Sequence, residues 1–126
     1  MLLPGAGART ELIEVVRVTS ATRDVFPGPL DGEDVALWAE DEVRQVPALI
    51  TELPEGARRR CFTPGWGIRA HGATALLFEI SFCFSCNGAR LWGPEVPAEH
   101  EDIHVFDADS PSAHALLSRF RAAGSG

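Results

Sequence analysis

The chain contains no lysine and no tyrosine, and only three of its 126 residues are cysteine. All basic residues are therefore arginine, and the eleven arginines face eighteen acidic residues, which gives a formal net charge of −7. This balance gives little electrostatic attraction for nucleic acid or an anionic membrane, and it suits a basic partner. We therefore expect neither nucleic acid nor a membrane as a partner.

Long hydrophobic runs are missing as well. No apolar stretch approaches the ~20 residues of a membrane span. The opening, MLLPGAGART, has neither the basic start nor the apolar centre of a secretory signal. A small, odd number of cysteines argues against a disulfide framework. The protein is therefore expected to be cytoplasmic, with its thiols reduced.

What the chain does contain is enough apolar material for a core. Its 45% hydrophobic residues are typical of a soluble globular protein of one domain. We expect a single domain over residues 1–126. The final Gly-Ser-Gly has the composition of a remnant of cloning.

Runs rich in β-branched and aromatic residues, bounded by Gly and Pro, predict strands at 11–18, 35–40, 66–70, 74–86, 89–92 and 103–106. The stretch VPALITEL, residues 46–53, predicts an amphipathic helix with Pro47 in its first turn. A C-terminal helix follows Ser110, which is expected to cap it. The chain is therefore expected to be an α+β fold, an antiparallel β-meander sheet with one or two helices packed on one face.

The stretch SFCFSCNGARLW carries two of the cysteines and an Asn-Gly pair. Asn-Gly between strand-like runs predicts a hairpin with a type I′ turn on Asn87 and Gly88. That register would pair Cys83 with Trp92. Because side chains alternate along a strand, it would also send Cys83 and Cys86 to opposite faces. The two sulfurs would then neither hold one metal ion nor form a redox pair.

A second hairpin is expected just before this one. A loop of three residues would pair Ile68 with Leu76 and Trp66 with Phe78. All of these apolar side chains would then lie on one face of the sheet, which is the face expected to meet the core.

Zinc binding remains an alternative for the cysteines. Cys83 and Cys86 would form a zinc knuckle, with Cys61 and a histidine completing four ligands of the types that zinc prefers. Against this stands the more frequent behaviour of free cysteines, which are mostly small buried hydrophobic residues.

A second zinc alternative comes from residues 100–104, HEDIH, which match H-E-x-x-H. In zinc peptidases this motif lies on a helix, so that His100 and His104 would bind the metal and Glu101 would act as general base. The following IHVF favours a strand instead, and chance matches to three fixed letters are common.

The segment RCFTPGWGIRAHGATALLFEISFCFSC resembles a loose group of small uncharacterised bacterial proteins. Their shared pattern is C-[FY]-x-P-x-[HW]-G-[IL]-R, then an apolar strand ending in C-F-x-C, then a C-terminal helix. The matching residues are Cys61, Phe62, Pro64, Trp66, Gly67, Ile68, Arg69, Cys83, Phe84 and Cys86. Trp66 stands where histidine is commoner in the group. The resemblance implies an immunity or accessory protein encoded beside a toxin, and it implies no catalytic residue.

Catalytic motifs are otherwise missing, since the sequence has no G-x-S-x-G, phosphate loop or dinucleotide fingerprint. We therefore expect a non-catalytic protein-binding module, immunity- or inhibitor-like, that binds a partner such as a basic toxin through acidic clusters. Glu40, Asp41 and Glu42 are the expected contacts. Trp38 or Trp92 would be the aromatic anchor, because tryptophan is enriched at binding hot spots. A small zinc protein is the alternative.

Overall fold

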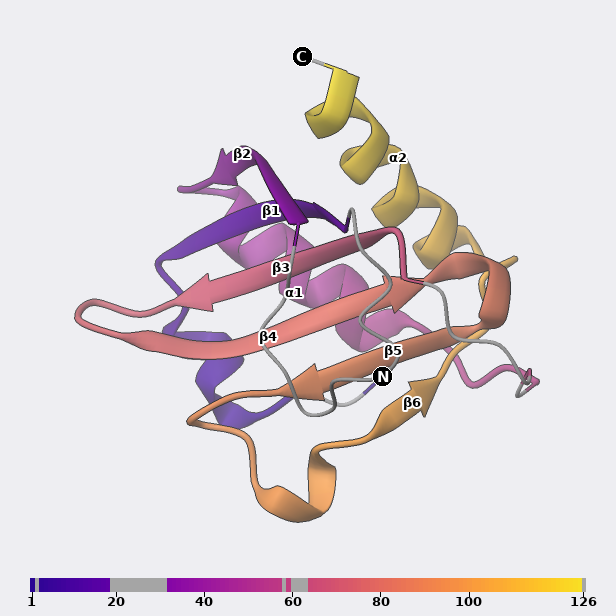
Figure 1. Cartoon of the computed structure of the whole chain (residues 1–126), viewed down its shortest axis with the longest axis horizontal. Helices are drawn as coiled ribbons and strands as arrows, with labels where there is room; N and C mark the ends of the chain where they lie inside the picture. The colour runs from indigo at the N-terminus through magenta and orange to yellow at the C-terminus, as the bar shows by residue number, and fades with distance from the viewer. Residues whose placement is uncertain (2, 19–31, 58, 60–63, 126) are drawn as a thin grey trace.

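The computed structural model describes residues 1, 3–18, 32–57, 59 and 64–125. Within these residues, one six-stranded sheet carries two α-helices on one face (Figure 1). The strand order is β2-β1-β3-β4-β5-β6, and every neighbouring pair is antiparallel. The α+β class predicted from the sequence is confirmed.

The strands are β1 (Leu12–Val18), β2 (Gly32–Trp38), β3 (Trp66–His71), β4 (Leu76–Cys83), β5 (Gly88–Trp92) and β6 (Ile103–Val105). Strands β3 to β6 form the expected meander. Strands β1 and β2 form a separate hairpin, and β1 is the strand that joins it to β3. Among the described strands, β2 and β6 therefore lie at the two edges of the sheet.

The first helix, α1 (Glu42–Glu52), begins before the predicted start at residue 46. Its first turn carries exposed and half-buried side chains, so the apolar spacing becomes visible only from Val46 onward. As a consequence Pro47 lies inside the helix and not in its first turn. A proline there removes one backbone hydrogen bond, and the Thr51 hydroxyl donates to the Pro47 carbonyl at 2.9 Å.

The second helix, α2 (Pro111–Ser125), starts where the sequence predicts. The Ser110 hydroxyl oxygen accepts a hydrogen bond from the Ala113 amide at 3.3 Å, which satisfies one of the free donors of the first turn. Three short 3₁₀ segments complete the described elements, η1 (Gly5–Arg9), η2 (Phe84–Cys86) and η3 (Ala98–His100).

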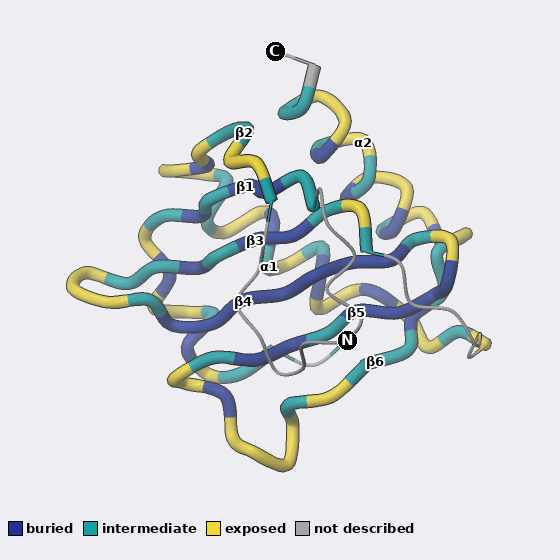
Figure 2. The backbone as a smooth tube through the Cα atoms, viewed as in Figure 1, coloured by how far each residue is buried: buried dark blue, intermediate teal, exposed yellow. Residues whose placement is uncertain are grey.

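The core lies between the sheet and the two helices. It is continuous over all central strands, and Figure 2 shows β4 dark along almost its whole length while β2 and β6 are lighter. An aromatic cluster forms around Phe120 of α2, which is fully buried. Its ring centroid is 5.5 Å from those of Trp38 and Trp66. The rings of Phe82 and Phe84 lie 5.6 and 6.2 Å away.

The predicted turn on Asn87 and Gly88 is wrong. Strand β4 ends at Cys83, segment η2 follows, and only Asn87 (φ 53°) adopts the left-handed conformation. Gly88 is already the first residue of β5, so Cys83 pairs with Gly88 and not with Trp92.

The Asn87 side chain explains this wider turn. Its amide nitrogen donates to the Ala57 carbonyl at 3.1 Å, and its amide oxygen accepts from the Ala108 N–H at 3.2 Å. These two contacts join segments far apart in the sequence. Tertiary contacts of this kind are invisible to a rule that depends only on the residues of the turn.

The register of the preceding hairpin is also wrong. Ile68 pairs with Ile80 and Trp66 with Phe82, four residues beyond the predicted partners, and a bulge follows Ala70. A shift by an even number of residues keeps the same side chains on the core face, so the apolar pattern does not distinguish the two registers.

Candidate functional site

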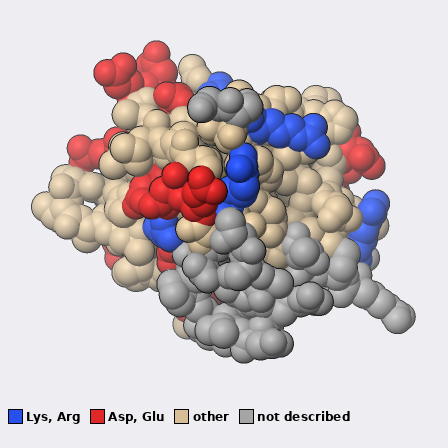
Figure 3. Space-filling view, turned by 45° about the horizontal axis from the view of Figure 1, so that its top comes forward, with Lys and Arg blue, Asp and Glu red and all other residues tan. Residues whose placement is uncertain are grey.

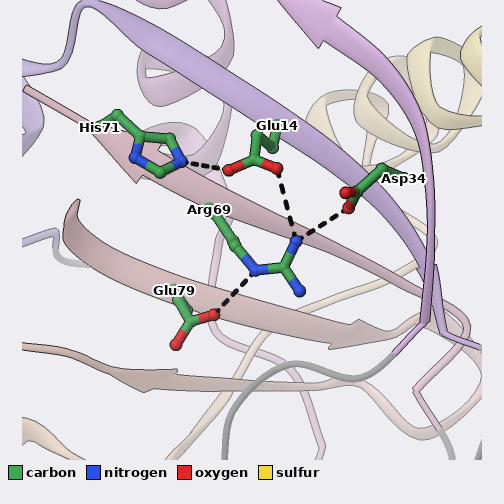
Figure 4. A network of polar contacts seen from close by, with 5 residues as sticks. All are labelled: Glu14, Asp34, Arg69, His71 and Glu79. Carbon is green, nitrogen blue, oxygen red and sulfur yellow. Dashed lines mark hydrogen bonds and ion pairs between the residues drawn. The ribbon is translucent and has the colours of Figure 1, made fainter.

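Charged side chains face one another on the side of the sheet turned away from the helices. Glu14 of β1 pairs with Arg69 of β3, and Arg69 pairs with Glu79 of β4. Arg69 lies among carboxylates in Figure 4, with Nη1 2.8 Å from Asp34 Oδ1 and 3.6 Å from Glu14 Oε2, and Nε 3.2 Å from Glu79 Oε1. His71 Nε2 contacts Glu14. We call these five residues the outer-face network.

The outer-face network is buried at one end and open at the other. The Glu79 side chain is 8% exposed, whereas that of Asp34 on β2 is 59% exposed. The network carries a net charge of −2 with a neutral His71 and −1 with an imidazolium. It therefore orders its own side chains and leaves a surplus of negative charge within the network.

An open hollow of about 470 Å³ adjoins this network. Its lining includes Glu14 and His71 from the network, Leu37 of β2, and the loop that joins β3 to β4. Leu37 is 64% exposed, and it is the one large hydrophobic side chain that is exposed among the described residues. The hollow therefore combines an apolar contact with adjacent carboxylate charge.

Exposed carboxylates lie along β2 and at the corner that follows it. Glu33 and Asp34 belong to β2, and Glu40 and Asp41 lie between β2 and α1; all four are exposed. We call these four residues the acidic edge. Figure 3 shows acidic side chains gathered on this side of the molecule, with arginines beside them. Leu37 lies between the two pairs in sequence.

The structure thus brings two of the three predicted contact residues to the surface beside an edge strand. Glu42 is half-buried in the first turn of α1. Asp41 Oδ1 pairs with Arg44 Nη2 at 2.9 Å, but both side chains are more than three-quarters exposed (76% and 80%). Such a pair contributes little to stability, because solvent screens it.

Glu40 has a positive φ of 57°, which is unfavourable for a residue with a Cβ atom. Replacing Glu40 with glycine is expected to raise the free energy of unfolding by about 0.5–1 kcal/mol, because glycine adopts this conformation without steric cost. Urea denaturation would measure the change. Glu42→Gly is the matched control, because it removes a carboxylate from the first turn of α1 and is expected to destabilise by about 0.3–1 kcal/mol. Equal destabilisation by the two glycine variants would contradict the conclusion that the positive φ of Glu40 is unfavourable.

Neither of the two tryptophans expected to anchor a partner is exposed. Trp38 is 6% exposed and packs on Phe120 in the core, and Trp92 is 8% exposed and lies opposite Glu79 on the outer face. The expectation that one of these two rings is exposed is therefore wrong. Leu37 occupies the exposed apolar position instead.

The HEDIH segment does not form the helix that a zinc peptidase requires. His100 ends η3, while His104 lies in β6, and His104 Nε2 contacts the His100 carbonyl at 3.0 Å. The Glu101 carboxylate accepts a hydrogen bond from the Gly93 amide at 3.3 Å. The strand predicted from IHVF is confirmed.

The two cysteines of the C-x-x-C stretch differ in state. Cys83 is a buried free thiol, whereas Cys86 is disulfide-bonded, so the two sulfurs are not joined to each other. The expectation that every thiol is reduced is therefore wrong for Cys86. Cys61 lies outside the described residues. Within the part of the chain that is described, no three His, Cys, Asp or Glu side chains are grouped to hold a metal ion.

The outer-face network was missed by reasoning from the sequence. One signal was present, because Glu79 interrupts the most apolar strand of the chain, and a carboxylate in such a strand is seldom buried without a partner. The identity of that partner depends on the strand register, which the sequence does not fix.

Comparison of the chain with models of known protein families, with curated proteins and with solved structures gave no match. Among the described residues, no helix combines the length and the apolar character needed to cross a membrane.

Proposed function

We propose that this protein is a non-catalytic binding module of the immunity or inhibitor kind, which binds a basic protein through the acidic edge. One observation carries the proposal: Leu37 is exposed on an edge strand and is flanked in sequence by exposed carboxylates. An exposed apolar side chain inside a charged rim is the arrangement that protein interfaces use, with a dry centre and a polar border.

The outer-face network supports binding more than chemistry. Arg69 directs its guanidinium to Asp34, Glu14 and Glu79. A guanidinium engaged in this way holds the surface in one shape and is not directed at a substrate. A preorganised surface loses less conformational entropy when a partner binds.

Charge supports a basic partner. The whole chain has a net charge of −7, and the acidic edge presents four exposed carboxylates, of which Asp34 also belongs to the outer-face network. Complementary charge mainly accelerates association and selects among partners, and added salt weakens this effect.

Reversing charge at the acidic edge should therefore slow partner binding. For the Glu40→Arg/Asp41→Arg variant we expect association with the partner to slow by about tenfold or more at low salt, with a much smaller difference at high salt. The partner is first captured on immobilised wild-type protein and identified by mass spectrometry, and association rates are then measured by surface plasmon resonance.

Glu99→Arg/Asp109→Arg is the matched control, because it changes the net charge equally at exposed positions on either side of β6, at the other edge of the sheet. This variant should retain most of the wild-type association rate. Equal slowing by both variants would show that only the net charge matters, and capture of no basic protein would overturn the proposed function.

A further inference from the structure

We propose that the partner binds by adding an extended, basic segment to the sheet as a further strand along β2. This inference rests on the proposed function and names the way in which the acidic edge is used. The occupant is one segment of a partner protein that alternates arginine or lysine with apolar residues.

The backbone of β2 offers the first half of the argument. Strand β2 is the last strand on its side of the described sheet, paired only with β1. In an antiparallel pair each strand turns half of its N–H and C=O groups toward its neighbour and the other half away from it. The backbone groups of β2 that point away from β1 are therefore oriented to pair with an incoming strand, as in other cases of strand addition.

The side chains of β2 determine which kind of segment fits beside it. Leu37 lies on the outer face, in the same row as Glu14, its partner on β1. Asp34 lies on that same face opposite Val16, and Glu33 lies on the other face opposite Arg17. A strand beside β2 would place side chains directly against these residues, at distances where opposite charges attract and like charges repel. An alternating segment in register with β2 would place its basic side chains on the face of Glu33 and its apolar side chains on the outer face, against Leu37. Asp34, on that outer face, is already paired with Arg69.

The same charges argue against a second copy of this chain as the occupant. Two β2 edges brought together would place exposed carboxylates of both copies at close range, which is one of the ways that natural sheets prevent edge-to-edge association. A bulge at Val35, where Val15 pairs with Ala36 and Val16 with Asp34, interrupts the ladder. Gly32 to Asp34 before the bulge and Ala36 to Trp38 beyond it are the two regular stretches on which an incoming strand would pair.

The experiment uses a fluorescent peptide, acetyl-Arg-Val-Arg-Leu-Arg-Val-Arg-amide, as the probe. The control peptide has the same sequence with every second backbone nitrogen methylated, which keeps the charges and side chains but removes the hydrogen-bond donors of one edge. Fluorescence anisotropy gives the affinity of the full chain for both peptides. Amide hydrogen exchange followed by NMR shows which backbone groups of β2 become protected.

We expect the unmodified peptide to bind at least about tenfold more tightly than the methylated one, because two or three backbone hydrogen bonds are lost. Outward-facing amides within Ala36–Trp38 should become protected only with the unmodified peptide. Equal binding of both peptides, or no added protection in β2, would overturn strand addition. It would leave the proposed function intact, because partner capture on the wild-type protein and the association rate of the Glu40→Arg/Asp41→Arg variant test that function separately. Protection that rises with protein concentration in the absence of peptide would also overturn the inference, in favour of a second copy.

Discussion

Replacing Phe120 with alanine is expected to lower the free energy of unfolding by about 3–5 kcal/mol, the usual cost of removing a buried aromatic ring. Phe120 is fully buried, and its ring lies within 6.2 Å of those of Trp38, Trp66, Phe82 and Phe84, measured between centroids. Its loss would leave a cavity between α2 and strands β2, β3 and β4. The change would be measured by urea denaturation followed by tryptophan fluorescence and circular dichroism.

Two control variants distinguish the loss of the Phe120 ring from a general effect of substitution in α2. His114→Ala, at an exposed position of the same helix, should change the free energy of unfolding by less than about 0.5 kcal/mol. Phe120→Leu should cost less than Phe120→Ala, because it fills part of the cavity. A loss of under about 1 kcal/mol for Phe120→Ala would contradict the central place given to this ring.

The features that depend only on residues close together in the sequence were well predicted. Ser110 is a typical cap residue directly before Pro111. The helical repeat predicts a buried stripe of Ala113, Leu116, Leu117 and Phe120, and all of these are buried except Leu117, which is half-buried. The core face of β4 follows in the same way from the alternation of side chains along a strand.

Strand register was the main failure, and it concealed the candidate site. The predicted register would place Arg69 opposite Ala75, whereas the structure pairs Arg69 with Glu79. Both alignments keep the same apolar side chains on the core, so hydrophobic patterning does not choose between them. The outer-face network exists only in the observed register.

Exposure of individual residues at the edge was equally hard to predict. Trp38 and Leu37 are neighbours on β2, and alternation requires that they point to opposite faces. The sequence does not state which face meets the helices. Trp38 packs on Phe120, and Leu37 is consequently the residue left at the surface.

Replacing Arg69 with leucine is expected to lower the free energy of unfolding by about 2–4 kcal/mol, because it removes a guanidinium from a largely buried carboxylate. The Glu79 side chain is 8% exposed and lies 3.2 Å from Arg69 Nε. This expected loss is smaller than the full cost of breaking a buried ion pair, because the Arg69 side chain is itself 22% exposed and solvent screens part of the interaction. Thermal and urea unfolding would both measure it.

The double variant Arg69→Leu/Glu79→Leu tests the reason for this loss. If the cost arises from a buried carboxylate that has lost its cation, removing the carboxylate as well should recover most of the stability, since an apolar pair often replaces a buried ion pair without loss. Arg44→Ala, which breaks the exposed pair with Asp41, should cost no more than about 0.5 kcal/mol. The single variant Glu79→Leu is measured alongside. If the double variant loses as much free energy of unfolding as Arg69→Leu and Glu79→Leu lose together, Arg69 stabilises the sheet through its packing and not through Glu79. The outer-face network would then be a consequence of the register and not one of the interactions that maintain it.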